Sequence, residues 1–142
     1  MIIAGGGTGG HLFPAIAIAE EMTRRNKEAK VLFIGTRNGI ESRVLPEEGW
    51  PVKFISAAGI KGRGPMAFFR GIMKMIHGTI QSLGIIRSFK PACVLGVGGY
   101  VSVPALIAAR ILGIKTAIHE QNSMPGLANR LLGKISHFQR LL

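Results

Sequence analysis

The sequence contains no aspartate and a single cysteine, Cys93, among its 142 residues. Its seven acidic residues are all glutamates. Paired carboxylates and cysteine–histidine sets are the usual ligands of divalent metals, and the sequence offers neither arrangement. One cysteine allows no disulfide within the chain, and its place in an apolar run predicts a buried thiol. We therefore expect no metal site, and outside the dinucleotide alternative considered below we expect no cofactor.

Long apolar runs are also missing. No uncharged apolar stretch reaches the roughly 18 residues that a membrane span requires. Glycines interrupt the first apolar run directly after Ala4, which is unlike a secretory signal. No glycine cluster is followed by Gly-Lys-Ser or Gly-Lys-Thr, so a nucleotide-triphosphatase loop is excluded. These absences predict a cytoplasmic protein.

Basic residues are in excess, with 18 lysines and arginines against seven glutamates. Residues 1–48 carry six charges of each sign, whereas residues 49–142 carry twelve basic residues and only Glu120. This asymmetry is typical of proteins that contact a phosphorylated ligand, an anionic membrane surface or nucleic acid, and it also fits a solvated basic face. The basic residues are scattered, without interleaved aromatics or a known recognition module. We therefore expect no nucleic-acid partner.

Short apolar runs alternate with helical periodicity along the chain. Buried strands are predicted at residues 1–4, 31–35, 52–56, 93–97 and 116–119, and helices at 13–25, 40–48, 65–88 and 103–112. Strict alternation of this kind predicts one α/β domain, a doubly wound parallel sheet of the Rossmann-like type. Ligands of such sheets bind at the carboxyl ends of the strands.

Three unusual loops follow the first, fourth and fifth predicted strands, at residues 5–12, 96–102 and 119–126. The first two are rich in glycine and precede helices, so their backbone N–H groups can cradle an anion. His11 adds a titratable imidazole to the first loop, and Tyr100 lies in the second. Glu120 in the third either balances a nearby cation, binds a sugar hydroxyl or orients an imidazole. We expect the three loops to meet at one edge of the sheet.

A dinucleotide site is an alternative interpretation of the first loop, which contains G-x-G-x-x-G at Gly5, Gly7 and Gly10. Pro14 is expected in the first helical turn, which would start the helix near residue 13 and make the loop longer than in dinucleotide sites. The second predicted strand is not followed by the acid that holds the ribose of NAD. Arg37 would suit the 2′-phosphate of NADP, so an NADP-binding domain stays open.

The predicted helix at residues 65–88 carries an apolar stripe bordered by cations. Apolar side chains recur at spacings of three and four, and Arg70 and Lys74 lie beside them. The stripe comprises Phe69, Ile72, Met73, Ile76, Ile80 and Leu83. Such a stripe either packs in the core or inserts shallowly into an anionic membrane. Three glycines, each of which costs about 1 kcal/mol of helix propensity, predict a kinked or broken helix.

Three long motifs together resemble one family. The runs GGGTGGHLFPAIAIAEEM, GVGGYVSVPALIAA and HEQNSMPGLANRLL resemble, in this order, the N-terminal domain of the MurG family. The resemblance implies an inverting GT-B glycosyltransferase of peptidoglycan synthesis, peripheral on the inner face of the bacterial plasma membrane. That family transfers N-acetylglucosamine from UDP-N-acetylglucosamine to the muramyl C4 hydroxyl of lipid I (undecaprenyl-pyrophosphoryl-muramyl-pentapeptide), which gives lipid II.

The resemblance also implies roles for residues of this chain. The acceptor diphosphate would be held by Thr8, Gly9, Gly10, Gly98, Gly99 and Tyr100. His11 would be the catalytic base or a ligand of the diphosphate, and Glu120 is the second catalytic candidate. Substrate would also be bound by Thr8, His119, Gln121 and Asn122, with Asn122 near the sugars. The apolar and basic stripe would hold the enzyme against the bilayer.

The resemblance covers residues 1–142 as an acceptor-binding domain, without the family's second domain, which binds most of the UDP-sugar. Residues 135–142 lie where the family pattern leads to another strand toward the interdomain linker, and we expect a domain truncated near this end. The chain should then hold acceptor groups without a donor site and be inactive alone. The competing hypothesis is a binding module that recognises a polyprenyl-diphosphate sugar or a lipid without chemistry.

Overall fold

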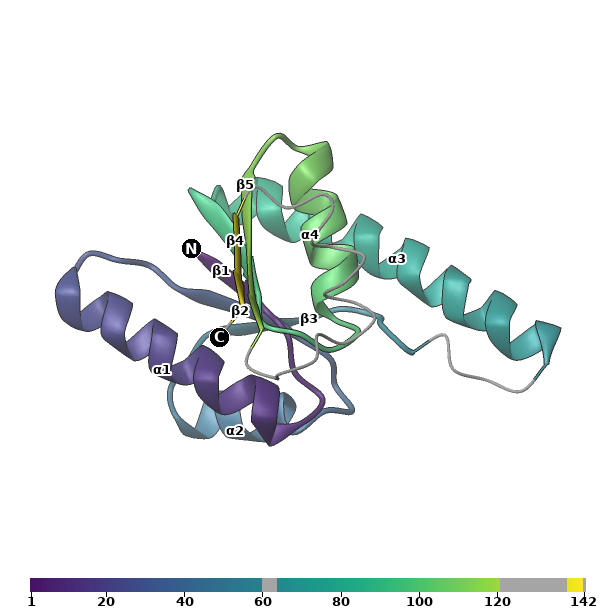
Figure 1. Cartoon of the computed structure of the whole chain (residues 1–142), viewed down its shortest axis with the longest axis horizontal. Coiled ribbons are helices and arrows are strands. Elements are labelled where there is room, and N and C mark those ends of the chain that lie inside the picture. The colour runs from purple at the N-terminus through teal and green to yellow at the C-terminus, as the bar shows by residue number, and fades with distance from the viewer. Residues whose placement is uncertain (60–63, 121–137, 142) are drawn as a thin grey trace.

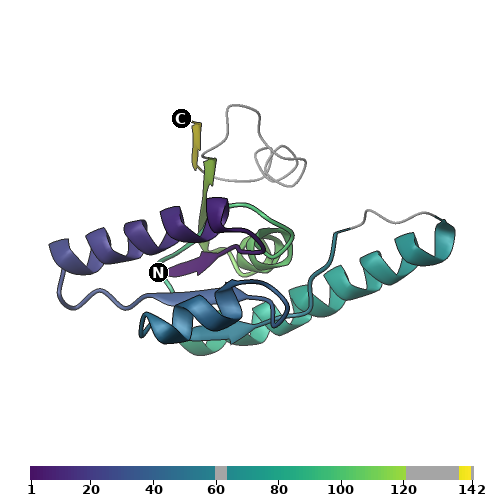
Figure 2. The same ribbon diagram turned by 90° about the horizontal axis from the view of Figure 1, so that it is seen from below.

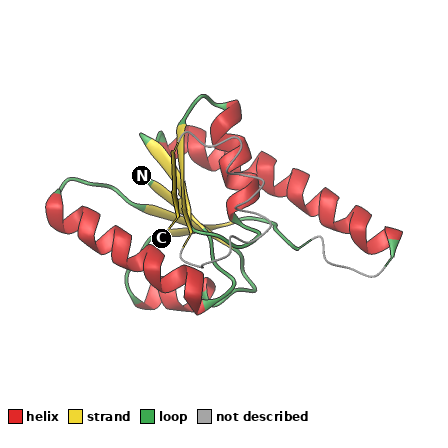
Figure 3. Ribbon diagram, in the orientation of Figure 1, coloured by secondary structure: helices red, strands yellow, loops and turns green. Residues whose placement is uncertain are grey.

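Six parallel strands form a single sheet in the order β3-β2-β1-β4-β5-β6. The computed structural model describes residues 1–59, 64–120 and 138–141, the last as backbone. The strands are β1 (Ile2–Ala4), β2 (Leu32–Gly35), β3 (Val52–Phe54), β4 (Cys93–Gly96), β5 (Lys115–Glu120) and β6 (Phe138–Leu141). The helices are α1 (Gly9–Arg25), α2 (Glu41–Glu47), α3 (Pro65–Phe89) and α4 (Ser102–Ile111). Helices α1 and α2 cover one face of the sheet, and α3 and α4 cover the other (Figure 1, Figure 3).

The direction in which strands are added reverses between β1 and β4. The chain builds β1, β2 and β3 outward, returns to the middle of the sheet, and then builds β4, β5 and β6 on the other side of β1. This is the doubly wound topology that the alternating pattern predicts, so the fold class is confirmed. Such sheets bind ligands at the point of reversal, where the loops that follow β1 and β4 both open.

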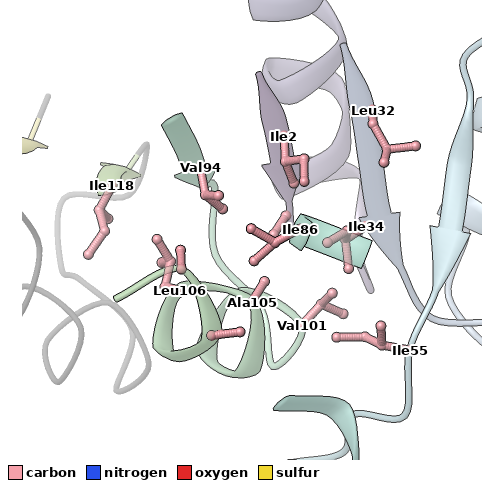
Figure 4. Close-up of a cluster of buried hydrophobic side chains, with 13 residues drawn as sticks. Ile2, Leu32, Ile34, Ile55, Ile86, Val94, Val101, Ala105, Leu106 and Ile118 are labelled. Atoms are coloured by element: carbon pink, nitrogen blue, oxygen red, sulfur yellow. The ribbon is translucent and has the colours of Figure 1, made fainter. Parts of the chain in front are cut away.

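Two apolar cores lie on opposite faces of the sheet, and alternate residues of β1 point into each of them. Ile3 packs with Leu12 of α1 and Phe33 of β2 in the first core. Ile2 packs with Ile86 of α3 in the second core, which Figure 4 shows. All five side chains are almost inaccessible to solvent. Burial on both faces explains why the central strands β1 and β2 are continuous apolar runs and not alternating patterns.

Helix α1 begins at Gly9, earlier than the start near residue 13 that the sequence predicts. The carbonyl of Thr8 accepts hydrogen bonds from the backbone N–H groups of His11 at 3.2 Å and Leu12 at 3.1 Å, which closes the first turn upstream of Pro14. Pro14 therefore lies inside the helix, where it has no N–H to donate one turn back. The predicted long loop was wrong, because the helix begins within the glycine motif.

Helix α3 is continuous over 25 residues, so it is not broken at its glycines as the sequence predicts. A Cβ on its Gly78 would collide with the backbone carbonyl of Ser56 and would lie 3.4 Å from Pro104 of α4. The missing side chain lets α3 approach its neighbours closely, and this packing offsets the low helix propensity of glycine. The N-terminal half of α3 extends beyond the sheet (Figure 2).

Strand β6 pairs in parallel with β5, with Phe138 opposite Ala117 and Leu141 opposite Glu120. This strand lies within residues 135–142, where the resemblance leads us to expect a further strand. The apolar runs of the sequence do not predict it. Among the described residues, no helix is both long enough and apolar enough to cross a membrane.

Candidate functional site

The glycine loops after β1 and β4 lie against each other at the carboxyl edge of the sheet. A Cβ placed on Gly99 would lie 2.6 Å from the carbonyl oxygen of Gly6. Gly99 also has a positive φ of 78°, and its carbonyl accepts a hydrogen bond from the hydroxyl of Ser102 at 2.8 Å. Glycine suits this position because it allows both the close backbone approach and the dihedral angle. The two loops therefore form one structural unit.

His11 lies in the first turn of α1 and packs on the second loop. A Cβ on Gly98, which has a φ of 105°, would lie 2.6 Å from Nδ1 and 2.7 Å from Cε1 of the imidazole. The His11 side chain is half-buried in this position. The structure thus brings the predicted catalytic histidine together with both predicted diphosphate loops.

The N-terminus of α1 offers hydrogen-bond donors and a positive partial charge beside these loops. Thr8 is the N-cap residue, yet its side chain makes no capping hydrogen bond and is exposed. Gly9 is half-buried and Gly10 is exposed, and the first turn contains no acidic residue. A helix N-terminus next to glycine loops is a favourable place for an anion such as phosphate.

Tyr100 borders the site on the side that leads to α3. Its ring packs on Gly59, where a Cβ would lie 2.7 Å from the phenolic oxygen. The residue is 51% exposed. Tyr100 is therefore held in place by the loop after β3 while half of its surface remains open to a ligand.

A buried carboxylate that the sequence did not single out organises the first loop. Glu41, the first residue of α2, is fully buried. Its Oε2 accepts a hydrogen bond from the backbone N–H of Gly7 at 2.8 Å. Its Oε1 accepts from both the backbone N–H and the hydroxyl of Thr36, each at 2.9 Å. The side chain thereby ties the loop after β1 to the loop after β2.

Glycines from three segments surround this carboxylate. Cβ atoms on Gly6, Gly35 and Gly39 would each collide with the side chain of Glu41. The position at the start of α2 adds a favourable partial charge for a negative group. Gly7, the partner in the first loop, lies 34 positions away in the sequence, so no local pattern reveals the contact.

The carboxyl end of β5 contributes His119 and Glu120 to the same edge of the sheet. Glu120 is 1% exposed and, two positions after Ile118, lies on the face that α3 and α4 cover. His119 points to the opposite face and is half-buried, and its buried Nδ1 has no hydrogen-bond partner in the described part of the chain. Gln121 and Asn122 lie outside the described residues. The roles proposed for these four residues remain predictions.

Most of the stripe on α3 faces solvent and not the core. The exposed large apolar side chains of α3 are Met66, Phe68, Phe69, Met73, Ile76 and Ile80. Arg70 and Lys74 are exposed among them, and Ile72 is half-buried. The interpretation of the stripe as core is therefore wrong for its four exposed residues, whereas Leu83 packs against the core.

Metal ligands do not gather in the site. Within residues 1–59 and 64–120, no group of three or more histidine, cysteine, aspartate or glutamate side chains is placed to hold a metal ion. The chemistry available at the sheet edge is that of backbone amides, hydroxyls, imidazoles and carboxylates.

Comparisons with known proteins point to one family. Residues 1–137 match the glycosyltransferase family 28 N-terminal domain. The UDP-N-acetylglucosamine--N-acetylmuramyl-(pentapeptide) pyrophosphoryl-undecaprenol N-acetylglucosamine transferase of Syntrophus aciditrophicus is 57% identical over 134 residues, which are 94% of this chain and 37% of that protein. The transferase of the same name from Geobacter sulfurreducens is 54% identical over 136 residues, or 96% of this chain and 37% of that protein. The chain thus spans little more than a third of the length of these curated relatives.

Solved structures share the fold. MurG of Acinetobacter baumannii matches with a TM-score of 0.83 and 32% identity, over 97% of this chain and 39% of that one. The Streptomyces glycosyltransferase SsfS6 matches in fold, with a TM-score of 0.61 and 15% identity over 93% of this chain and 42% of that one. The family match, the relatives and the doubly wound sheet agree, and the chain therefore belongs to glycosyltransferase family 28, in which it corresponds to the N-terminal domain.

Proposed function

We propose that the chain is the acceptor-binding half of an N-acetylglucosaminyltransferase that acts on lipid I. The observation that carries the proposal is the junction of two glycine loops with an imidazole, in which His11 packs on Gly98 and Gly99 packs on Gly6. The names of the relatives state a UDP-N-acetylglucosamine donor and an acceptor in which a pyrophosphate links a muramyl-pentapeptide to undecaprenol. A diphosphate is a group that glycine loops and a helix N-terminus bind well.

In the proposed reaction, backbone N–H groups of the two loops and the Thr8 hydroxyl donate hydrogen bonds to the diphosphate. Tyr100 borders the bound diphosphate. The C4 hydroxyl oxygen of the muramyl sugar bonds to the anomeric carbon of the donor as the bond from that carbon to UDP breaks. Attack from the side opposite UDP inverts the anomeric centre. His11, as a neutral imidazole, accepts the proton that the hydroxyl loses. Glu120 and the residues next to it line the part of the site that binds the sugars.

The donor is proposed to bind mainly to a second domain. The chain spans 37% of the length of its relatives, and the site described above accounts for an acceptor diphosphate alone. Calorimetric titration separates the two ligands. We expect the chain to bind a short-chain lipid I analogue and to give little or no heat with UDP-N-acetylglucosamine. Binding of the donor without the acceptor would contradict the proposal.

A glycine variant sharpens this titration. Gly98→Ala should weaken acceptor binding by at least about tenfold, because its methyl group would press on the imidazole of His11 and displace the loop. Gly113→Ala is the matched control: Gly113 also has a positive φ, 69°, but a Cβ there meets no atom within 4 Å. Equal losses in both variants would show that backbone strain and not the site causes the effect.

We further propose that α3 rests on an anionic membrane surface and that the enzyme is peripheral at the cytoplasmic face. Large apolar side chains are exposed along its projecting half, with Arg70 and Lys74 between them. Twelve of the 18 basic residues of the chain follow residue 48. Exposed apolar side chains bordered by cations favour shallow insertion into anionic lipid.

Replacing Phe69, Met73 and Ile76 together by serine should weaken binding to phosphatidylglycerol-containing vesicles by at least about tenfold, because less apolar surface enters the lipid. The three side chains are 58%, 43% and 50% exposed, so the circular dichroism spectrum should not change. Co-sedimentation with vesicles measures the effect. Ile111→Ser, at a residue of α4 that is 63% exposed, is the control and should bind as the parent chain does. Unchanged binding of the triple variant would exclude this face of α3 as the membrane contact.

A further inference from the structure

A polar cavity lies at the carboxyl ends of β2 and β3, on the same edge of the sheet as the glycine loops. Its volume is about 260 Å³, and its walls come from the loop after β2, the end of β3 with the residues that follow, and α3. Its polar and charged lining residues are Thr36, Arg37, Asn38, Ser56, Lys74 and Gln81. No acidic residue lines the cavity. The diphosphate site proposed above does not use it.

The cavity adjoins the first glycine loop through the buried carboxylate of Glu41. Thr36 lines the cavity and donates to Oε1 of Glu41, whose Oε2 accepts from the N–H of Gly7. Thr36 and Glu41 thus connect the wall of the cavity to the loop that is proposed to hold the diphosphate. A ligand whose phosphates lie on that loop can place a neighbouring substituent in the cavity.

Three side chains of the lining, Gln81, Arg37 and Lys74, can donate hydrogen bonds to a ligand. The Oε1 of Gln81 accepts a hydrogen bond from the backbone N–H of Ser56 at 2.6 Å, which leaves the amide NH₂ group to donate. The guanidinium carbon of Arg37 lies 5.3 Å from the centre of the Phe54 ring, and this stacking holds the cation at the wall. Lys74 adds a second cation from α3.

The two cations of the cavity make no ion pair in the described part of the chain, which contains all seven acidic residues. The glutamate that does pair with arginines lies elsewhere, on α1. There Arg24 and Arg25 donate to Glu21 and lower its pKa to about 2. An arginine, a lysine and an amide NH₂ around one cavity suit a small anion, and the planar guanidinium matches a carboxylate in particular.

We propose that this cavity binds a carboxylate on the peptide arm of the acceptor, with Arg37, Lys74 and Gln81 as its donors. The inference rests on the proposed function, because the acceptor named in the relatives carries a pentapeptide. The lactyl carboxyl of the muramyl sugar forms an amide with the peptide, so the far end of the peptide is a free carboxylate. Five residues span at most about 17 Å, which brings carboxylates of the arm within reach of a cavity next to the diphosphate loop.

Soluble acceptor analogues that differ only in the peptide test this inference. Each carries a muramyl 1-diphosphate with a short prenyl chain: one has a pentapeptide with free carboxylates, the second has these converted to carboxamides, and the third has no peptide. Calorimetry with the full 142-residue chain should give about tenfold tighter binding for the free carboxylates than for the carboxamides. In NMR spectra, the side-chain N–H signals of Arg37 and Gln81 should shift with the first analogue only.

Charge-removing variants assign the effect to the cavity. Arg37→Gln/Lys74→Gln should bind the two peptide analogues alike, with the affinity that the parent chain has for the carboxamide. The control Lys27→Gln/Arg87→Gln also removes one lysine and one arginine charge, from exposed positions near the opposite edge of the sheet. It should keep the tenfold preference for the free carboxylates over the carboxamides. Because the analogues are soluble and no vesicles are present, the lipid contact proposed for α3 does not enter the measurement.

The outcomes separate this inference from the proposed function. If the parent chain binds both peptide analogues equally and still binds the peptide-free analogue, the carboxylate site is wrong and the diphosphate site stands. If it binds none of the three, both are wrong. If inorganic phosphate shifts the Arg37 and Gln81 signals as much as the free-acid peptide does, the cavity takes any small anion and its assignment to the peptide arm is overturned.

Discussion

His11→Ala is expected to slow glycosyl transfer by about 10²- to 10⁴-fold, which is what a positioned general base contributes. Transfer requires a donor site, so the chain is fused to the remaining part of the Syntrophus aciditrophicus relative, whose matching region is 57% identical. The measurement follows N-acetylglucosamine incorporation into a short-chain lipid I analogue. The control is His77→Ala, at an exposed histidine of α3, which should leave the rate unchanged. If the fusion with the parent sequence transfers no sugar, the competing hypothesis of a binding module is favoured.

A pH series on the same fusion separates the two roles proposed for His11. A general base must have a free lone pair to accept the proton of the hydroxyl, so this role predicts a kcat that falls at low pH. A diphosphate ligand acts best as an imidazolium, so acceptor affinity would instead rise at low pH. We expect the loss of kcat with little change in acceptor Kd. A gain in affinity at low pH that His11→Ala abolishes would make His11 a diphosphate ligand, and near-normal transfer by the variant would remove it from the mechanism.

The sheet and the place of the site could be predicted because their signals are local. Leu32–Gly35 is buried at every position, and a short apolar run that is bounded by turn residues favours such a strand. Glycine-rich loops after two of these strands mark where the backbone must turn with positive φ, as it does at Gly98 and Gly99. The rule for doubly wound sheets then places both loops at the point of reversal.

The features that the sequence did not reveal depend on contacts between distant segments. Helix α3 runs unbroken through Gly78 because that glycine packs on the carbonyl of Ser56, which periodicity does not show. The spacing of apolar residues indicated the stripe on α3, but only the position of α3 beyond the sheet decides that the stripe is exposed. Glu41 resembles any acid at the start of a helix until the fold brings Gly7 to its carboxylate.

Glu41→Ala is expected to lower the free energy of unfolding by about 2–5 kcal/mol, measured by urea denaturation. The substitution leaves the backbone N–H groups of Gly7 and Thr36 without their acceptor in a part-buried place, and each such loss costs about 1–3 kcal/mol. Glu47→Ala, on the same helix but exposed, is the control and should change stability by no more than about 0.5 kcal/mol. A similar small change in Glu41→Ala would mean that the carboxylate does not hold the loops together.

Glu41→Gln distinguishes an effect of this side chain on the position of the first glycine loop from its effect on the stability of the fold. The glutamine oxygen can still accept from Thr36, which places its NH₂ group against the N–H of Gly7, so that two donors face each other. We expect this variant to remain folded and to bind the lipid I analogue about tenfold more weakly, because the first glycine loop loses its anchor. The removed negative charge acts in the opposite direction, since a carboxylate near a diphosphate repels it. Tighter binding by Glu41→Gln would therefore show that charge dominates, whereas weaker binding with retained stability shows that the shape of the loop decides affinity.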